Sequence, residues 1–534
     1  MTGKAVKEAA CRMKPEKSDI SGSYTSTALL NAPDIFFDHM AMVYRSWLVH
    51  GTVTPSLLSC AFIPLLKGGL KDPANTDSYR AIAASSLLLK LFDNLIILLW
   101  GDKLSTDTLQ FGFKSGTSTT ECSWLVMEVA SYFLRRGTPC IVTLLDCSKA
   151  FDTCQFSELF NKLYEKGLPV LVIRALIFVY EEQVAWVSWG KANSEPFRIV
   201  NGTRQGSVLS PYFFSVYIDE LLGNLRRSGV GCHIGGKFLG AAGYADDIIL
   251  LAPCRSAMEE MIKICEDFGE ENNLKFSTDD NPAKSKTKCI LMCGPKMRNP
   301  VYPAPLLLYG KQLPWVSHAT HLGHELNQDC TMNMDTKMKR ASFISSSTDI
   351  REMFSFALPA QVLSAVSIYS AHFYGSMIWD LYGEMAGQVY RSWSTCVKLV
   401  WKLPRATHNY LVENLLSMGF PSVREKILAQ YVGFLRRLVN SISPEVRMLS
   451  CIVAQDIRSP TGRNCLNLGN EFDIDPWLTS PSTLKSKYKQ YEVPEADMWR
   501  LPLLTTLLHQ RYDLSACGDD TETVDGLIDS LCSS

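Results

Sequence analysis

The sequence predicts an α+β fold, with an antiparallel sheet near the middle of the chain and a helical region after it. Two apolar runs flank a short polar turn between Phe238 and Ala252, which is typical of a β-hairpin. Another apolar run begins at Pro139 and predicts a strand that ends at Asp146. From about residue 326 onward, apolar residues recur at helical spacing.

The predicted hairpin turn carries two adjacent carboxylates, in the motif Tyr244-Ala245-Asp246-Asp247. Carboxylates set between apolar strands repel each other unless a cation neutralises them, and hard oxygen ligands suit a divalent ion such as Mg²⁺. Asp146 supplies a third carboxylate from a separate strand. Two-metal phosphoryl transfer needs carboxylates that converge in this way on ions roughly 3.5–4 Å apart. The three residues therefore predict a catalytic metal site rather than a solvated Asp-Asp turn.

A polar loop at residues 201–209 leads into a predicted helix, with Ser210 placed as the N-cap and Pro211 as the first helical residue. Together with the acidic motifs, this loop resembles a known family: the chain is similar to the reverse transcriptases of non-LTR (LINE-type) retrotransposons. Eight segments occur in the order typical of that family, over about 260 residues. They are 62–69 (FIPLLKGG), 78–82 (SYRAI), 110–116 (QFGFKSG), the strand ending at Asp146, 204–206 (RQG), 244–247 (YADD), 284–288 (KSKTK) and 321–324 (HLGH).

The resemblance implies a right-hand polymerase with fingers, palm and thumb, in which the antiparallel sheet forms the palm. The expected domains are an N-terminal leader at 1–50, fingers and palm at 51–325, a helical thumb at 326–410, and a helical C-terminal region with an acidic tail at 411–534. Apolar periodicity predicts an edge strand at 288–292 and ten helices, at 28–48, 82–99, 119–134, 155–166, 170–182, 210–226, 258–272, 332–347, 359–379 and 383–403.

The resemblance also implies roles for individual residues. Asp146 and Asp246 are expected to bind both of two Mg²⁺ ions, with Mn²⁺ as an alternative, and Asp247 is expected to have a weaker or indirect role. The backbone carbonyl of Cys147 is a further expected metal ligand. The Cys147 thiol has no His partner in the sequence pattern, which favours an ordinary buried thiol over a nucleophile.

Basic residues are expected to handle the phosphates of the incoming nucleotide. Lys67 and Arg80 match residues of the fingers that grip the triphosphate, although either could be a solvated surface residue. Lys286 is expected to be the general acid that protonates pyrophosphate, but Lys284 and Lys288 fit the same spacing.

Other matching residues are expected to position the sugar, the template and the primer. Phe151 resembles the steric gate, a ring that leaves no room for a 2′-hydroxyl; the alternative is a core Phe at the start of a helix. Gln205 and Gly206 resemble the loop along the nucleotide and template, where Gly permits close backbone approach. The expected primer grip, whose histidine could equally be a surface residue, is His321, Leu322 and Gly323.

Composition is compatible with a globular nucleic-acid enzyme. The chain of 534 residues is 46% hydrophobic and 20% charged, with a net charge of −1, and its basic residues concentrate at 275–298 and 391–405. The 17 cysteines show neither regular pairing nor zinc-site spacing, and no segment is apolar enough to be a signal peptide or to span a membrane. We expect an intracellular protein of the nucleus or cytoplasm whose partners are an RNA template, a DNA primer or target-site DNA, and dNTPs.

Two other functions remain open at this point. One is an inactive or domesticated copy that binds RNA without catalysis, in the manner of a maturase, and the other is an RNA-dependent RNA polymerase. The intact acids, Gln205 and Phe151 argue against an inactive copy, and Phe151 argues against an RNA polymerase, which needs space for the 2′-hydroxyl. Only 61 residues precede the first matching segment, so we expect no endonuclease domain ahead of it.

Overall fold

The computed structural model describes residues 1–68, 72–148, 150–204, 206–294, 301–408, 412 and 422–489. Gln205 and the predicted acidic tail lie outside the described residues. Contacts divide the chain into two compact units. The first comprises residues 1–122, 138–293 and 297–317, and the second comprises 123–137, 294–296 and 318–534.

The N-terminal part of the first unit is helical. Helix α3 (Asp34–His50) packs on α1 (Gly3–Ala10) and on α8 (Val170–Glu181), and α1 also contacts α4 (Leu87–Trp100). Tyr44, Trp47 and Phe92 form an aromatic cluster between α3 and α4, with ring centroids 5.0–5.3 Å apart. The expected leader is therefore packed into the first unit through its apolar face.

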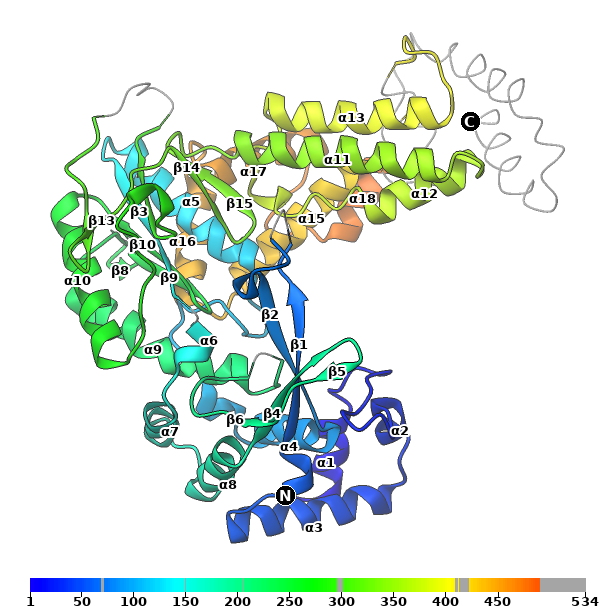
Figure 1. Ribbon diagram of the computed structural model, residues 1–534. Helices are drawn as coiled ribbons and strands as arrows, with labels where there is room; N and C mark the ends of the chain where they lie inside the picture. The colour runs from blue at the N-terminus through cyan, green and yellow to red at the C-terminus, as the bar shows by residue number, and fades with distance from the viewer. Residues whose placement is uncertain are drawn as a thin grey trace. The chain divides into compact units, whose positions relative to one another are not determined.

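A first sheet extends from this helical base. Its strand order is β2-β1-β4-β5, where β5 is Ala192–Asn193, and β6 (Phe197–Arg198) pairs with β4. Strand β1 (Ser59–Leu66) runs antiparallel to β2 (Tyr79–Ser85) and parallel to β4 (Val184–Trp189). The antiparallel pair β1 and β2 forms the long arm visible in Figure 1.

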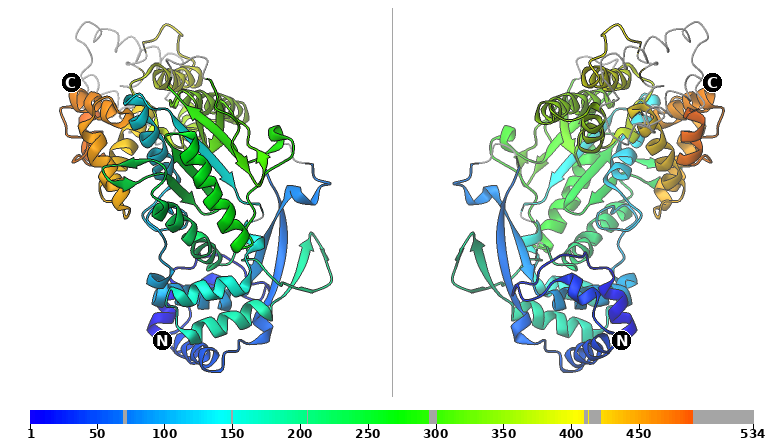
Figure 2. Two further views of the ribbon diagram at one scale, coloured as in Figure 1. Left: turned by 90° about the vertical axis from the view of Figure 1, so that its left-hand side faces the viewer. Right: turned by 90° about the vertical axis from the view of Figure 1, so that its right-hand side faces the viewer.

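The second sheet has four antiparallel strands in the order β11-β3-β10-β9. Its inner strand β3 (Cys140–Asp146) is almost wholly apolar and buried, as expected for a strand with neighbours on both sides. Helices α9 (Ser210–Ser228) and α10 (Arg255–Glu271) pack on each other and on this sheet (Figures 1 and 2). The predicted α+β fold with an antiparallel sheet is confirmed.

The remaining elements of the first unit are short or connect these layers. They are α2 (Ser26–Leu30), α6 (Ala150–Thr153), α7 (Phe156–Glu165), β5 (Ala192–Asn193), β6 (Phe197–Arg198), β7 (His233–Ile234), β8 (Lys237–Phe238), β9 (Ala241–Tyr244), β10 (Asp247–Ala252), β11 (Lys288–Met292), β12 (Leu307–Leu308), β13 (Lys311–Gln312) and the 3₁₀ turns Pro55–Leu57, Thr76–Ser78, Gly101–Leu104 and Pro282–Lys284.

The second unit is mainly helical, as predicted for the C-terminal region. Its elements are most of α5 (Thr119–Arg135), the hairpin β14 (His318–His321) and β15 (His324–Asn327), then α11 (Asn333–Met353), α12 (Pro359–Tyr369), the 3₁₀ turn Ser376–Ile378, α13 (Glu384–Val400), α15 (Val423–Val439), α16 (Pro444–Gln455), α17 (Pro460–Phe472) and α18 (Pro481–Lys489).

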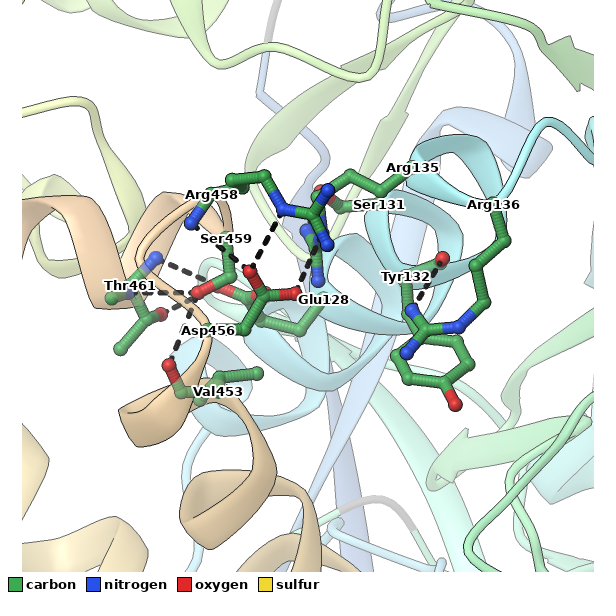
Figure 3. Close-up of polar contacts among 11 residues, drawn as sticks. Glu128, Ser131, Tyr132, Arg135, Arg136, Val453, Asp456, Arg458, Ser459 and Thr461 are labelled. Atoms are coloured by element: carbon green, nitrogen blue, oxygen red, sulfur yellow. Dashed lines mark hydrogen bonds and ion pairs between the residues drawn. The ribbon is translucent and has the colours of Figure 1, made fainter.

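A buried polar cluster joins α5 to the start of α17 (Figure 3). Glu128 accepts hydrogen bonds from the backbone N–H of Thr461 at 2.9 Å and from its hydroxyl at 2.6 Å. Arg135 pairs with Asp456 at 3.2 Å, and the Trp124 indole N–H donates to the Thr461 hydroxyl at 2.8 Å. These contacts place a helix that is early in the sequence within the C-terminal helical unit.

Several predicted element boundaries are wrong. The helix predicted for 28–48 begins at Asp34, because the short helix α2 ends at Leu30 and Pro33 takes the cap position of α3. Residues 82–85 belong to strand β2, and the helix begins only after Ser86, whose hydroxyl caps it; a continuous apolar run does not distinguish strand from helix. The helix predicted for 359–379 ends at Tyr369. Ser210 is the first residue of α9 rather than its N-cap, and Leu209 takes the cap position.

None of the helices in the described ranges is both long enough and apolar enough to cross a membrane. The cysteines of the described ranges are all free thiols.

Candidate active site

The second sheet brings the three predicted carboxylates to one edge. Asp146 is the last residue of β3 and lies directly opposite Asp247, the first residue of β10. Asp247 also pairs with Tyr244 of β9, which leaves Ala245 and Asp246 as a two-residue turn. Directly opposite residues have side chains on the same face with Cβ atoms about 4.5–5.5 Å apart. The predicted juxtaposition of the three acids is therefore present in the backbone register.

Electrostatics at this edge disfavour three bare negative charges. The pKa of Asp247 is raised to about 6, first by desolvation and then by the charges of Asp246 and Asp146. Desolvation also raises the pKa of Asp246, and the negative charge of Asp146 raises it further. A hydrogen bond from the Asp246 backbone N–H and the positive charge of Arg80 lower this pKa. A cation bound between the carboxylates would relieve this repulsion.

Two further features of the edge suit a divalent ion. The Oδ2 atom of Asp146 is buried and has no hydrogen-bond partner among the described residues. Cys147 forms an isolated bridge with Phe276, flanked by the hydrogen bonds Ser277 N–H to Asp146 O (2.7 Å) and Ser148 N–H to Lys275 O (2.9 Å). In such a pair the carbonyl of Cys147 points away from Phe276. The donor set therefore fits a hard cation.

The side chains do not form a closed metal site as they stand. Within the described ranges, no three residues of the types His, Cys, Asp and Glu are gathered closely enough to hold an ion. The thiol of Cys147 is buried, and burial raises its pKa well above the ordinary value, so it is neither a thiolate nucleophile nor a thiolate ligand. The prediction of an ordinary buried thiol is confirmed.

Lys286 is the lysine of the 284–288 segment that reaches the acids. Its ammonium lies 3.6 Å from Oδ2 of Asp146, and its side chain is 70% exposed. Lys284 lies in a 3₁₀ turn, and Lys288 is the first residue of β11, opposite Leu144. This geometry favours Lys286 among the three candidates.

Phe151 lies in the short helix α6, a few residues after Asp146. It is partly exposed, and its ring stacks on Phe214 of α9 with centroids 4.7 Å apart and planes 28° apart. Its carbonyl accepts a hydrogen bond from the N–H of Thr203 at 2.6 Å, which ties the 202–204 loop to this helix. One side of the ring is thus packed while the residue keeps contact with solvent.

Gly206 makes a close approach that other residues could not. Its φ is +108°, and a Cβ there would lie 2.9 Å from the carbonyl oxygen of Ala83 in β2. This close approach is to the backbone of the first sheet, and the expected approach to nucleotide and template stays a prediction. Gln205 lies outside the described residues.

Lys67 and Arg80 lie at the outer end of the β1–β2 pair. Arg80 is opposite Leu65 and is exposed, and its charge acts on Asp246. The ammonium of Lys67 donates to the carbonyl of Asp77 at 2.8 Å. The charge of Arg80 therefore reaches Asp246, whereas Lys67 closes the β1–β2 connection.

The predicted primer-grip residues form the turn of the β14–β15 hairpin in the second unit. Leu322 and Gly323 have φ values of +50° and +79°, the pattern of a type I′ turn. The Tyr374 hydroxyl donates to Leu322 O at 3.0 Å, and the Lys339 ammonium donates to Gly323 O at 2.9 Å. The turn is thus held by side chains of its own unit.

The histidines beside this turn are not surface residues. His321 and His324 are buried, and burial lowers their pKa values to about 3 and about 4. The alternative that they are surface residues is wrong, and at neutral pH neither carries a charge that could bind phosphate.

Sequence reasoning missed two residues of the matching segments. Arg204 is buried, with its guanidinium 5.2 Å from the ring centroid of Tyr180 and close to the buried Asp93, whose pKa desolvation raises to about 6. Gln110 is fully buried against the acidic turn. Both residues belong to matching segments, but nothing in the sequence indicates which residue of such a segment is buried.

Comparisons with known proteins point to one family. Residues 67–326 match the family model described as reverse transcriptase (RNA-dependent DNA polymerase). The chain is 26% identical over 201 residues to the retrovirus-related Pol polyprotein from type-2 retrotransposable element R2DM of Drosophila melanogaster. The aligned region covers 38% of this chain and 19% of that protein. It is 25% identical over 256 residues to the retrovirus-related Pol polyprotein from type-1 retrotransposable element R2 of Nasonia vitripennis, covering 48% and 24%.

A third relative is the RNA-directed DNA polymerase from mobile element jockey of Drosophila melanogaster, 26% identical over 257 residues, covering 46% of this chain and 27% of that protein. The matched parts thus span between 19% and 27% of these relatives. Among solved structures, telomerase from Candida albicans in complex with a TWJ fragment of telomeric RNA aligns with a TM-score of 0.37 and 12% identity, covering 85% of this chain and 68% of that chain, a similarity too low to define a fold.

The chain contains a reverse transcriptase domain. It is similar in sequence to reverse transcriptases of non-LTR retrotransposons, so the predicted family is confirmed. Reverse transcriptases in general use divalent metal ions, which agrees with the donor set at the sheet edge.

Proposed function

We propose that the chain is an RNA-directed DNA polymerase that extends a primer 3′ end on an RNA template, as part of a retrotransposon. The observation that carries this proposal is the register of the second sheet, which sets Asp146 opposite Asp247 with Asp246 in the adjoining turn. The RNA-polymerase and catalytically inactive alternatives have no observation of their own in their favour.

Asp146, Asp246, Asp247 and the Cys147 carbonyl would hold two Mg²⁺ ions, with Mn²⁺ as an alternative. When bound, the ions would supply activation of the attacking hydroxyl and stabilisation of the leaving pyrophosphate. Oδ2 of Asp146, which accepts no hydrogen bond among the described residues, and the raised pKa values of Asp246 and Asp247 support this assignment.

Basic side chains around the acids would bind the triphosphate and move a proton. Lys286, 3.6 Å from Asp146, would donate its proton to the pyrophosphate oxygen as the general acid. Arg80 would bind phosphate oxygens with its fork of N–H donors. Lys67, whose ammonium contacts a backbone carbonyl, would contribute charge at the outer end of the same strands.

Phe151 would lie beneath the sugar and select deoxynucleotides. The stacking on Phe214 supports this role, because it fixes the ring without burying it completely. Gln205 and Gly206 would lie along the nucleotide and template, since Gly206 brings this loop against β2.

The second unit would act as thumb and C-terminal region, with His321, Leu322 and Gly323 as the primer grip. In this unit α11 and α13 lie side by side (Figure 1) and enclose a groove of about 210 Å³. Its lining includes Arg340, Arg351 and Arg391, and none of the described residues that line it is acidic. Three guanidinium groups without a carboxylate suit a nucleic-acid backbone. The basic segment 391–405 would extend this contact, and the basic segment 284–288 of the first unit would make nucleic-acid contacts of its own.

The partners would be an RNA template, a DNA primer or target-site DNA, and dNTPs, in the nucleus or cytoplasm. The first test is primer extension on a homopolymer RNA template, with dNTPs or rNTPs, and with Mg²⁺ and Mn²⁺ supplied separately. We expect extension with dNTPs only. Template binding without extension would contradict the proposed activity, and preferential use of rNTPs would favour an RNA polymerase.

A further inference from the structure

The matching segment 110–116 has no part in the chemistry described above, yet it meets the acidic turn directly. Gln110 is fully buried. Its side-chain oxygen accepts hydrogen bonds from the N–H of Ala245 and the N–H of Gly112, both at 2.9 Å. Its side-chain nitrogen faces the carbonyl of the same Ala245 at 3.4 Å. One side chain therefore contacts both backbone groups of the first turn residue.

Backbone contacts bring Gln110 into this position. The segment forms a parallel bridge to β9, with Gln110 opposite Gly243. Phe111 N–H donates to Gly243 O at 2.7 Å, and Gly243 N–H donates to Leu109 O at 2.9 Å. The segment thus covers the free edge of β9 and reaches the turn from the adjacent position.

The turn needs this support for two reasons. Ala245 has φ +58°, and Asp246 is not among the residues with positive φ, which matches a type II′ turn whose first position favours Gly. Ala245 is also buried, and the polar groups of a turn residue are not used by the strand ladder. Without Gln110, a buried N–H and a buried carbonyl would lose their partners.

Gly112 makes the close approach possible. A Cβ at this position would lie 2.3 Å from the N atom of Ala245, so any other residue would push the segment off the turn. With the Gln-x-Gly spacing, the side-chain amide of Gln110 reaches the backbone N–H of Ala245, and Gly112 leaves room for that same atom.

The residues just before this segment are fixed to α9. The N–H of Asp107 donates to Asp219 at 2.5 Å, and the carboxylate of Asp107 pairs with Arg226 at 2.8 Å. The same carboxylate accepts from the N–H of Leu109 at 2.8 Å. A continuous set of contacts therefore runs from a packed helix to the turn that carries Asp246.

We propose that Gln110 is a positioning residue for the metal-binding acids: it holds the Ala245–Asp246 turn so that Asp246 and Asp247 are presented at the sheet edge opposite Asp146. The inference rests on the proposed function of these acids. It assigns Gln110 no contact with metal, nucleotide or nucleic acid.

The test substitutes Gln110→Met, which keeps the length of the side chain and removes its hydrogen bonds. The matched control is Gln183→Met, because Gln183 is equally buried in the same unit and lies just before β4 of the other sheet. Two quantities are measured for each protein: Mn²⁺ affinity by electron paramagnetic resonance without nucleotide, and the Mg²⁺ concentration for half-maximal primer extension. Thermal unfolding is recorded in parallel.

We expect Gln110→Met to weaken Mn²⁺ binding, and to raise the Mg²⁺ requirement, by about tenfold, the scale of one or two hydrogen bonds. Gln183→Met should stay within about twofold of wild type in both. If Gln110→Met does not fold, Gln110→Asn replaces it, since its amide is one carbon too short to reach Ala245.

Metal affinity within about twofold of wild type for the Gln110 variant, or an equal loss in the Gln183 variant, would overturn the inference. A wild-type protein that binds Mn²⁺ through these acids but extends no primer would contradict the proposed function alone, because the Mn²⁺ titration still tests the positioning role.

Discussion

Truncation of Phe151 tests sugar selection, because a steric gate and a core residue respond differently. The Phe151→Ala change removes a ring that is partly exposed and stacked on Phe214 at 4.7 Å. A fully buried Phe→Ala change costs about 3–5 kcal/mol, so partial burial implies roughly 2 kcal/mol. Loss of the aromatic pair adds ~1 kcal/mol. We expect a stability loss of about 3 kcal/mol for the first unit.

The catalytic effect should go beyond this loss of stability. If the ring lies beneath the ribose, its removal relieves a clash with the 2′-hydroxyl, and a relief of only ~1.4 kcal/mol raises ribonucleotide use about tenfold. The assay is the ratio of rNTP to dNTP incorporation in single-nucleotide primer extension, measured below the unfolding temperature of each variant.

A matched control comes from the other sheet of the same unit. Phe62 in β1 is also half-buried and stacks on one ring, that of Phe197, at 6.2 Å and 13°. Phe62→Ala should lower stability and leave the ratio unchanged. If Phe151→Ala behaves in the same way, the steric-gate assignment is wrong and Phe151 is a packing residue.

Three further predictions follow from other parts of the chain. Asp246→Ala should abolish extension and leave RNA binding nearly unchanged in a filter-binding assay, because it removes a metal ligand and no phosphate contact; activity within about twofold of wild type would refute the metal assignment. Affinity for primer–template should fall steeply as the salt concentration rises. The double variant Arg340→Gln/Arg391→Gln should reduce the slope of log affinity against log salt by about one to two. An unchanged slope would show that the α11–α13 groove does not contact the nucleic acid. Burial raises the pKa of Glu128 above its ordinary value, so this residue stabilises the fold at low pH and that contribution is lost as the pH rises through the raised pKa. Glu128→Gln keeps the acceptor for Thr461 but cannot ionise, so it should unfold at a higher temperature than wild type at pH 8 and at a similar temperature near pH 4; an equal difference at both pH values would contradict this reasoning.

The carboxylate cluster and most elements could be predicted because their signals are local. Alternating and continuous apolar runs define β3 and β10, and the acids stand at the strand ends, so Asp146 and Asp247 meet once the strands pair in register. The failures occur where a local signal is ambiguous. Residues 82–85 have an apolar run compatible with either state, and only pairing with β1 makes them a strand.

The family could be recognised, and the three candidate metal-binding acids predicted, from the sequence alone, since motif order and residue chemistry do not depend on three-dimensional detail. Tertiary structure decided the rest, because burial and contact join residues far apart in the chain. It selected Lys286 by its approach to Asp146, and it buried His321 and so removed its charge. It also placed Gln110 against Ala245, which is 135 positions away in the sequence. A sequence pattern shows which side chains can form hydrogen bonds. Only the packing of the folded chain determines which protein groups lie beside a buried side chain and bond to it in place of water.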